Sequence, residues 1–130
     1  MLPFIPLPEN YGFLRRDGLR YPSAQDVDGA IVGALRSLAR DRPVWILGGS
    51  FTVAIPDSSR AYHCSVLISP SGDVVAQYRN LYLFDVDLGS DGGSFRKSDA
   101  IALGDQVVSA KTDFGILYMS IVYDLRYPEL

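Results

Sequence analysis

The sequence predicts an α/β protein in which one helix packs against a layer of strands. Two observations predict this fold class. Apolar residues recur at helical spacing between residues 23 and 41, and from Val44 onward short runs rich in Val, Ile, Tyr and Trp alternate with turn residues. The 130 residues have the length of a single domain (1–130), and 48% of them are hydrophobic, so a core can form.

The helix is predicted to begin after Ser23, because a Ser with Asp26 three positions later is a weak form of the capping box. It should end near Asp41, since Pro43 disfavours helical backbone in the residue before it. One face should pack and the rest should be solvated. The packing stripe consists of Val27, Ala30, Ile31, Ala34, Leu35 and Leu38.

The rest of the chain is predicted to be strands joined by turns. Residues 4–7 are flanked and interrupted by prolines, which favours an extended segment or an edge strand. The turn residues 69–73 predict a hairpin, and the glycine-bearing segment 88–104 has little periodicity and predicts a loop. The last apolar run is typical of a strand covered on both faces. The expected strands are 44–48, 51–55, 62–68, 74–78, 106–110 and 115–123.

Charge and composition exclude several classes of protein. The formal net charge is -3, and the one dense basic patch, at residues 15–20, is interrupted by Asp17, so no nucleic-acid surface is predicted. No apolar run approaches the roughly 18 residues that a membrane span needs. The first eight residues do not resemble a secretory signal. No cofactor and no metal are expected, and a lone thiol, Cys64, fits the cytosol or an organelle matrix such as that of mitochondria.

Four segments, in order, resemble the carbon-nitrogen hydrolases of the nitrilase superfamily. The segment 7–10 (LPEN) resembles a strand-end motif that bears a glutamate, and 44–50 (VWILGGS) a strand that ends in Gly-Gly-Ser. The segment 78–85 (YRNLYLFD) is similar to the one that bears the family's lysine, and 121–130 (IVYDLRYPEL) to the one that bears its cysteine. Together they extend over the whole chain.

Cleavage of an amide or a nitrile by covalent catalysis needs a thiolate nucleophile, a carboxylate base and a group that stabilises the oxyanion. The resemblance implies Cys, Glu and Lys in these roles, with a second Glu assisting. Glu9 matches the general base. The lysine position is Asn80, the second glutamate position is Lys97 and the cysteine position is Val122.

These substitutions predict that none of the four positions is catalytically active. Valine has no lone pair and no ionisable proton, so Val122 cannot form a covalent intermediate. Asn80 can donate a hydrogen bond but carries no full charge, and loss of one oxyanion donor typically costs about 100- to 1000-fold in rate. Lys97 reverses a charge.

Other polar residues near these motifs have two interpretations each. Glu9 is either the retained base or a surface cap of a strand end. His63 and Cys64 are adjacent in a predicted strand, so their side chains point to opposite faces and cannot form a dyad, and Cys64 is expected in the core. Ser120 should share a strand face with Val122 and is the nearby candidate for a replacement nucleophile, without a neighbouring base in the sequence.

Two further features have structural and functional interpretations. Asp124 and Arg126 resemble a pair that positions the turn after the family's nucleophile strand, or they form a solvated ion pair. The glycine-bearing loop 89–93 lacks the Lys-Ser/Thr and the helix start of a phosphate loop, so a flexible loop is expected.

The resemblance implies an αββα sandwich about twice as long as this chain. The chain corresponds to its front half, incomplete on its own, which exposes apolar strand faces and edges. The sequence therefore predicts a non-catalytic pseudoenzyme that acts as a structural or interaction subunit, packs on another protein chain and forms a homo- or hetero-oligomer. Two alternatives are a fragment of a split amidase or nitrilase that a partner completes, and a small-molecule binding module that uses the former active-site pocket.

Overall fold

A computed structural model describes residues 3–12, 26–90 and 92–130, and it confirms the α/β class. Two short 3-10 helices, η1 (Lys97–Asp99) and η2 (Val122–Arg126), lie in the second half. The other elements are β1 (Phe4–Pro6), α1 (Ala30–Asp41), β2 (Trp45–Leu47), β3 (Phe51–Ala54), β4 (Ala61–Ile68), β5 (Val74–Arg79), β6 (Asp85–Asp87), β7 (Ser94–Arg96), β8 (Ile101–Ala102), β9 (Ser109–Thr112) and β10 (Gly115–Tyr118).

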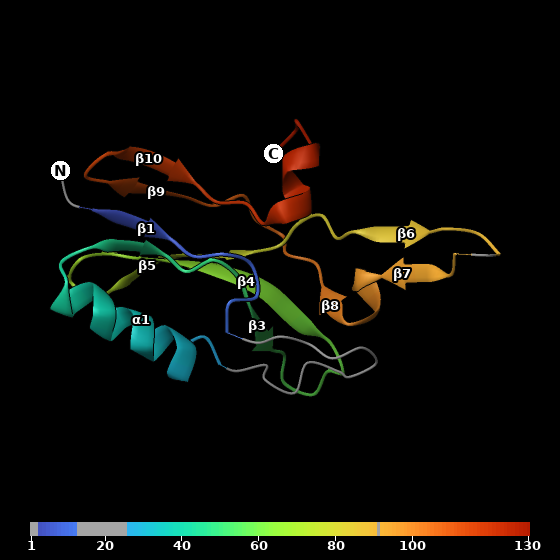
Figure 1. Cartoon of the computed structure of the whole chain (residues 1–130), viewed down its shortest axis with the longest axis horizontal. Coiled ribbons are helices and arrows are strands. Elements are labelled where there is room, and N and C mark those ends of the chain that lie inside the picture. Colours follow the sequence, from blue (N-terminus) through green and yellow to red (C-terminus); the bar gives the residue numbers. More distant parts are fainter. Residues whose placement is uncertain (1–2, 13–25, 91) are drawn as a thin grey trace.

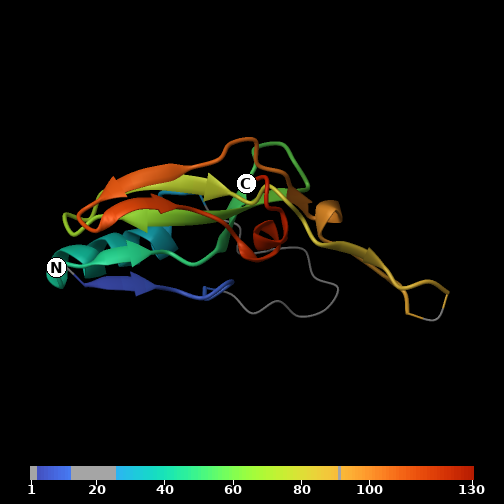
Figure 2. The same cartoon turned by 90° about the horizontal axis from the view of Figure 1, so that it is seen from above.

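The described part of the chain forms three layers. Strand β4 is the centre of the main sheet, where it pairs with β2, β3, β5 and β8, and β1 lies parallel to β2 at one edge. Helix α1 covers one face of this sheet, and the β9–β10 hairpin covers the other (Figure 1). The β6–β7 hairpin extends away from these layers as an arm, which is also clear in the rotated view of Figure 2.

Each interface between layers has its own core. The first lies between α1 and the main sheet and includes Val32, Leu35, Ile46, Cys64 and Val66. The second lies between the main sheet and the β9–β10 hairpin, and its buried members are Trp45, Leu67, Tyr78, Met119 and Ile121. The β4 strand contributes to both because alternate side chains point to opposite faces.

The helix prediction is correct at its end and wrong at its start. Helix α1 ends at Asp41, as expected, but it begins at Ala30, with Gly29 as the N-cap. Asp26 instead closes a turn, because its carbonyl oxygen accepts a hydrogen bond from the Gly29 amide at 2.8 Å. The predicted cap, Ser23, lies outside the described residues, as does the basic patch at 15–20.

The early strands lie within one or two residues of the expected positions. The expected loop 88–104 is correct at 88–90, but it is wrong over 94–102. This segment contains most of the β6–β7 arm, η1 and β8. Each of these strands has only two or three residues, too few to give a recognisable alternation. Strand β8 forms because it pairs in parallel with the first residues of β4, and this buries Ile101.

The end of the chain also differs from the prediction. The strand expected at 106–110 is observed as β9 (109–112), and the run 115–123 is a strand only as far as Tyr118. It is not covered on both faces: Ile116 is 66% exposed and Tyr118 is 71% exposed, whereas Met119 and Ile121 are buried. The outer face of the β9–β10 hairpin therefore exposes Ile116 and Tyr118, which pair across the hairpin with Lys111 and Ser109.

Within the described residues, no helix combines the length and the hydrophobicity that crossing a membrane would require.

Candidate functional site

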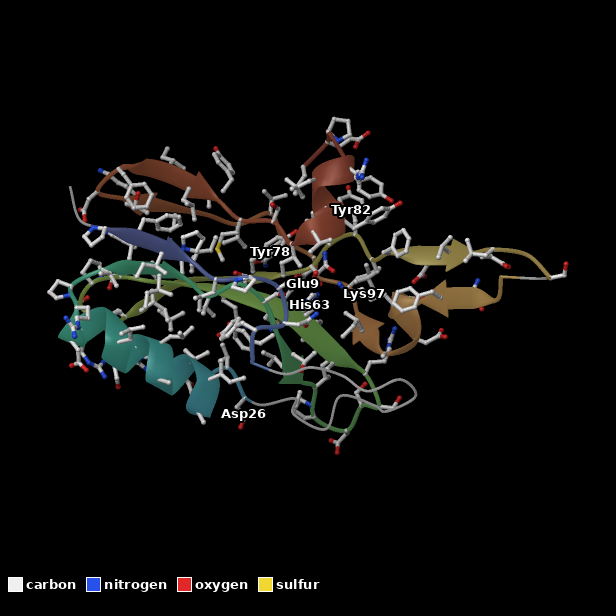
Figure 3. All side chains as sticks on the ribbon, viewed as in Figure 1. Glu9, Asp26, His63, Tyr78, Tyr82 and Lys97 are labelled. Atoms are coloured by element: carbon white, nitrogen blue, oxygen red, sulfur yellow. The ribbon has the colours of Figure 1, made fainter. Side chains whose placement is uncertain are left out.

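The four positions singled out by the sequence lie around one site at the ends of several elements. Glu9 follows β1, Asn80 follows β5, Lys97 begins η1 and Val122 begins η2. His63 of β4 lies beside Glu9 and Lys97, so the site also includes a residue that sequence reasoning set aside (Figure 3). Segments far apart in the chain thus bring their polar groups together.

The segment that carries Glu9 is held against the turn after β2. The Asn10 amide donates to the Ser50 hydroxyl at 3.2 Å, and the Ser50 amide donates to the Pro8 carbonyl at 3.3 Å. Gly49 lies so close to the Pro8 carbonyl oxygen that an added Cβ would be 2.0 Å from it. The Gly-Gly-Ser turn therefore positions Glu9 by direct backbone contact.

Lys97 is at the centre of the polar cluster. Its Nζ lies 2.8 Å from His63 Nδ1, 3.2 Å from Asn80 Oδ1 and 3.7 Å from Glu9 Oε1. Burial lowers the pKa of Lys97, and the charges of Glu9 and Asp124 oppose this effect. The resemblance implies a lysine at position 80, where this chain has Asn80. The site nevertheless contains a lysine, Lys97, which is on η1.

His63 is the functional residue that sequence reasoning missed. Its side chain is 2% exposed, and burial together with the Lys97 charge lowers its pKa from 6.5 to about 3. It is therefore neutral at pH 7, and Nδ1 accepts from the Lys97 ammonium, so the ring proton is on Nε2. Nε2 is buried without a hydrogen-bond partner and lies 3.7 Å from Glu9 Oε1. No local signal marks this residue, because its partner Lys97 is 34 positions away.

The buried His63 is expected to make folding pH-dependent. Between pH 6.5 and about 3 the unfolded chain binds a proton at this residue and the folded chain does not, so the free energy of unfolding falls as the pH falls. The contribution is at most about 1.4 kcal/mol per pH unit. Urea unfolding of wild type and His63→Gln at several pH values between 7 and 4 measures it. A shallower slope for the variant is expected, and equal slopes would contradict the prediction.

Asp124 ties the elements of the site together from inside. It is fully buried, and its Oδ1 accepts from Asn80 Nδ2 at 2.9 Å and from the Tyr82 amide at 2.8 Å. Its Oδ2 accepts from Tyr78 Oη at 2.6 Å and from the Ile121 amide at 2.8 Å. Burial and this contact raise the pKa of the Tyr78 hydroxyl, which stays a donor. The idea of a solvated ion pair is therefore wrong for Asp124, although Arg126 does reach a cavity.

Val122 stands at the mouth of the site in an unusual conformation. Its φ is +44°, in the left-handed region, where a β-branched residue is strained. Its side chain is 55% exposed and lines both a large cavity and a smaller one of about 130 Å³. Ser120 lines the smaller cavity with Glu9, but the expected strand shared by Ser120 and Val122 is absent because η2 begins at Val122.

The large cavity has a volume of about 850 Å³ and combines charged groups with aromatic walls. The aromatic rings contact one another: the Phe84 centroid is 5.1 Å from that of Tyr123 and 6.1 Å from that of Phe95. This cavity can hold a small molecule with an apolar body and polar ends. Its lining consists of Glu9, Asn10, Phe84, Phe95, Lys97, Val122, Tyr123, Leu125 and Arg126.

Cys64 does not belong to this site. It is fully buried against α1, and burial raises its pKa to about 11. Its expected place in the core is confirmed, and as in the prediction it points away from the face that carries His63. In the described ranges, no three or more His, Cys, Asp or Glu side chains are grouped so that they could hold a metal ion.

Comparison with known proteins gives consistent relatives. The carbon-nitrogen hydrolase family model matches residues 4–130. The deaminated glutathione amidase of Synechocystis is 33% identical over 129 residues, which cover 97% of this chain and 47% of that protein. A Schizosaccharomyces pombe protein named Hydrolase C26A3.11 is 37% identical over 99 residues, or 75% of this chain and 29% of that protein.

Solved structures share the fold. Nit3 of Saccharomyces cerevisiae, described as a member of branch 10 of the nitrilase superfamily, is 22% identical and superposes with a TM-score of 0.79 over 98% of this chain and 44% of that chain. The NitFhit protein of C. elegans is 28% identical, with a TM-score of 0.71 over 79% of this chain and 25% of that chain. This chain spans about half the length of the curated relatives it matches, or less. The match over residues 4–130 shows that the chain belongs to the carbon-nitrogen hydrolase family.

Proposed function

We propose that this chain is a non-catalytic member of the family that acts as a structural or interaction subunit and packs its open sheet face on another protein chain. The observation that carries the proposal is Val122. The side chain that stands at the mouth of the cavity, in the position of the cysteine motif, is an isopropyl group and has no nucleophilic atom.

None of the remaining polar groups of the site supplies a thiol. Glu9 and Lys97 lie 3.7 Å apart, but the thiol that Glu9 would deprotonate is absent. The only cysteine of the sequence, Cys64, is buried in the other core. Asn80 Nδ2 donates to Asp124 and to two backbone carbonyls, and Asn80 Oδ1 accepts from Lys97. These hydrogen bonds give Asn80 a structural role.

The open hairpin supports the subunit role. Ile116 and Tyr118 point outward from β10, while their neighbour Leu117 packs into the core between the layers. Two large apolar side chains side by side in water favour association, and the β9–β10 hairpin belongs to a sheet of two short strands with free edges. A partner chain that covers this face would bury Ile116 and Tyr118.

Replacing Ile116 and Tyr118 together with lysine is expected to abolish association while the chain stays folded, because both side chains face outward. Native mass spectrometry of the protein isolated from its source identifies the assembly, and sedimentation of the wild-type and variant chains measures its loss. Val75→Lys, at a 45% exposed position on β5, is the matched control and should leave the assembly intact. A wild-type chain that travels alone as a compact monomer would refute the subunit role.

A second candidate function, a small-molecule binding module, is favoured by the cavity of about 850 Å³. It predicts that a ligand raises the melting temperature of a monomeric chain without turnover. The split-amidase alternative instead predicts amide or nitrile hydrolysis that is sensitive to Glu9→Gln. Detection of such turnover in the isolated assembly would overturn the non-catalytic assignment.

A further inference from the structure

The site lost a sulfur nucleophile, but it contains a primary amine in a setting that favours reaction with carbonyl groups. Lys97 is one of only two lysines in the sequence, and the other, Lys111, is exposed on β9. The Lys97 side chain is 14% exposed and lines the aromatic cavity. Its position gives the amine a carboxylate neighbour, Glu9, at 3.7 Å, and an open volume in front.

We propose that Lys97 forms a reversible imine with an aromatic aldehyde that carries a carboxylate, bound in the cavity of about 850 Å³. The inference does not depend on the subunit role, because the cavity lies at the strand ends and not on the outer face of β9–β10. It also differs from amide cleavage, because the reacting atom is Lys97 Nζ.

The groups around Nζ suit each part of this reaction. An amine attacks a carbonyl only when uncharged, and burial of Lys97 lowers its pKa, which enlarges the uncharged fraction near neutral pH. His63 Nδ1 accepts a hydrogen bond from Nζ and is too weak a base to take its proton, since the pKa of His63 is about 3. Glu9 and the buried Asp124 are the acidic groups that act on Lys97, and Glu9 is placed to take the proton.

The step balances without an oxidant or a reductant. Glu9 takes a proton from the ammonium, and the Lys97 nitrogen lone pair forms a C–N bond with the carbonyl carbon while the carbonyl π pair moves to oxygen. The resulting carbinolamine loses its oxygen as water, with one proton returned by Glu9 and the other taken from nitrogen. The products are a protonated imine and one water molecule, Glu9 is again a carboxylate, and hydrolysis reverses the reaction.

The walls of the cavity select the class of carbonyl compound. Phe84, Phe95 and Tyr123 offer aromatic surface for a ring, and Arg126 lines the same cavity and can pair with a carboxylate. Lys97 reacts with the carbonyl carbon of the ligand and does not pair with the carboxylate on its ring. Arg126 is then the fixed cation of the cavity for an acidic ligand.

The test is reductive trapping of the 130-residue chain with 4-carboxybenzaldehyde and cyanoborohydride at pH 7, with each lysine quantified by peptide mass spectrometry. Each rate is divided by the rate for the same lysine in guanidinium chloride. This ratio is expected to exceed one for Lys97, because burial lowers the pKa of its amine and the cavity can hold the ring and the carboxylate of the aldehyde beside it. It should not exceed about one for Lys111, which is exposed on β9.

Variants separate the roles of the cavity groups. Lys97→Arg should remove the fast adduct, whereas Lys111→Arg should leave it unchanged. Arg126→Gln should slow trapping of 4-carboxybenzaldehyde more than that of benzaldehyde, and Glu9→Gln should slow both. A Lys97 ratio of one or less would overturn the proposal, and so would equal effects of Arg126→Gln on the two aldehydes. Neither result bears on whether the chain joins an assembly.

Discussion

Replacing Asp124 with alanine is expected to lower the free energy of unfolding by about 3–5 kcal/mol. The carboxylate is fully buried and accepts four hydrogen bonds. Its removal takes the acceptor from the Tyr78 hydroxyl and from the Tyr82 and Ile121 backbone amides, and it takes one of three acceptors from Asn80 Nδ2. Urea or thermal unfolding monitored by circular dichroism measures the loss.

Two matched variants test whether this loss comes from burial. Tyr78→Phe removes one of the four donors and should cost about 1–2 kcal/mol. Asp85→Ala also removes a carboxylate that accepts hydrogen bonds, in this case from Ser98, but at an exposed position where water replaces them. Of the three variants, Asp85→Ala should lower the free energy of unfolding least. An Asp124→Ala chain as stable as Asp85→Ala would show that the buried network does not hold the site together.

The contrast between Asp124 and His63 shows what the sequence can predict. Asp124 is part of a recognisable motif, and its structural role could be proposed from the segment alone. Its partners Tyr78, Asn80 and Tyr82 also lie in a motif segment, so only the contact between the two segments was unknown. His63 lies in a strand with no motif, and its role depends on Lys97, which approaches from η1 after the β6–β7 arm.

The predictions that failed depended on contacts between distant segments. Helix α1 begins late because Asp26 closes a turn through its backbone, which a capping pattern does not reveal. The last apolar run stops being a strand because Asp124 accepts the Ile121 amide and starts η2. Strand periodicity predicted the early strands well, and three of them, β2, β3 and β5, pair with β4.

Replacing Gly49 with alanine is the second substitution expected to have a large effect. Gly49 has a φ of +38°, which L-residues with a side chain rarely adopt, and an added Cβ would lie 2.0 Å from the Pro8 carbonyl oxygen and 2.7 Å from that of Leu7. Because both obstacles are backbone atoms, the segment before Glu9 must move. We expect a loss of at least about 2 kcal/mol in the free energy of unfolding, measured by urea unfolding.

The control is Gly33→Ala in α1, where an added Cβ has no atom within 4 Å apart from its chain neighbours and the backbone of the helix itself. Alanine has the higher helix propensity, so this variant should gain about 0.5–1 kcal/mol. If Gly49→Ala lowers the free energy of unfolding and Gly33→Ala raises it, the loss at Gly49 comes from the clash with backbone atoms and not from the added methyl group itself. The displacement of Glu9 by Gly49→Ala should also slow imine trapping at Lys97, because the proton acceptor moves away from Nζ. A Gly49→Ala chain with wild-type stability and trapping would mean that the Gly-Gly-Ser turn does not position the site.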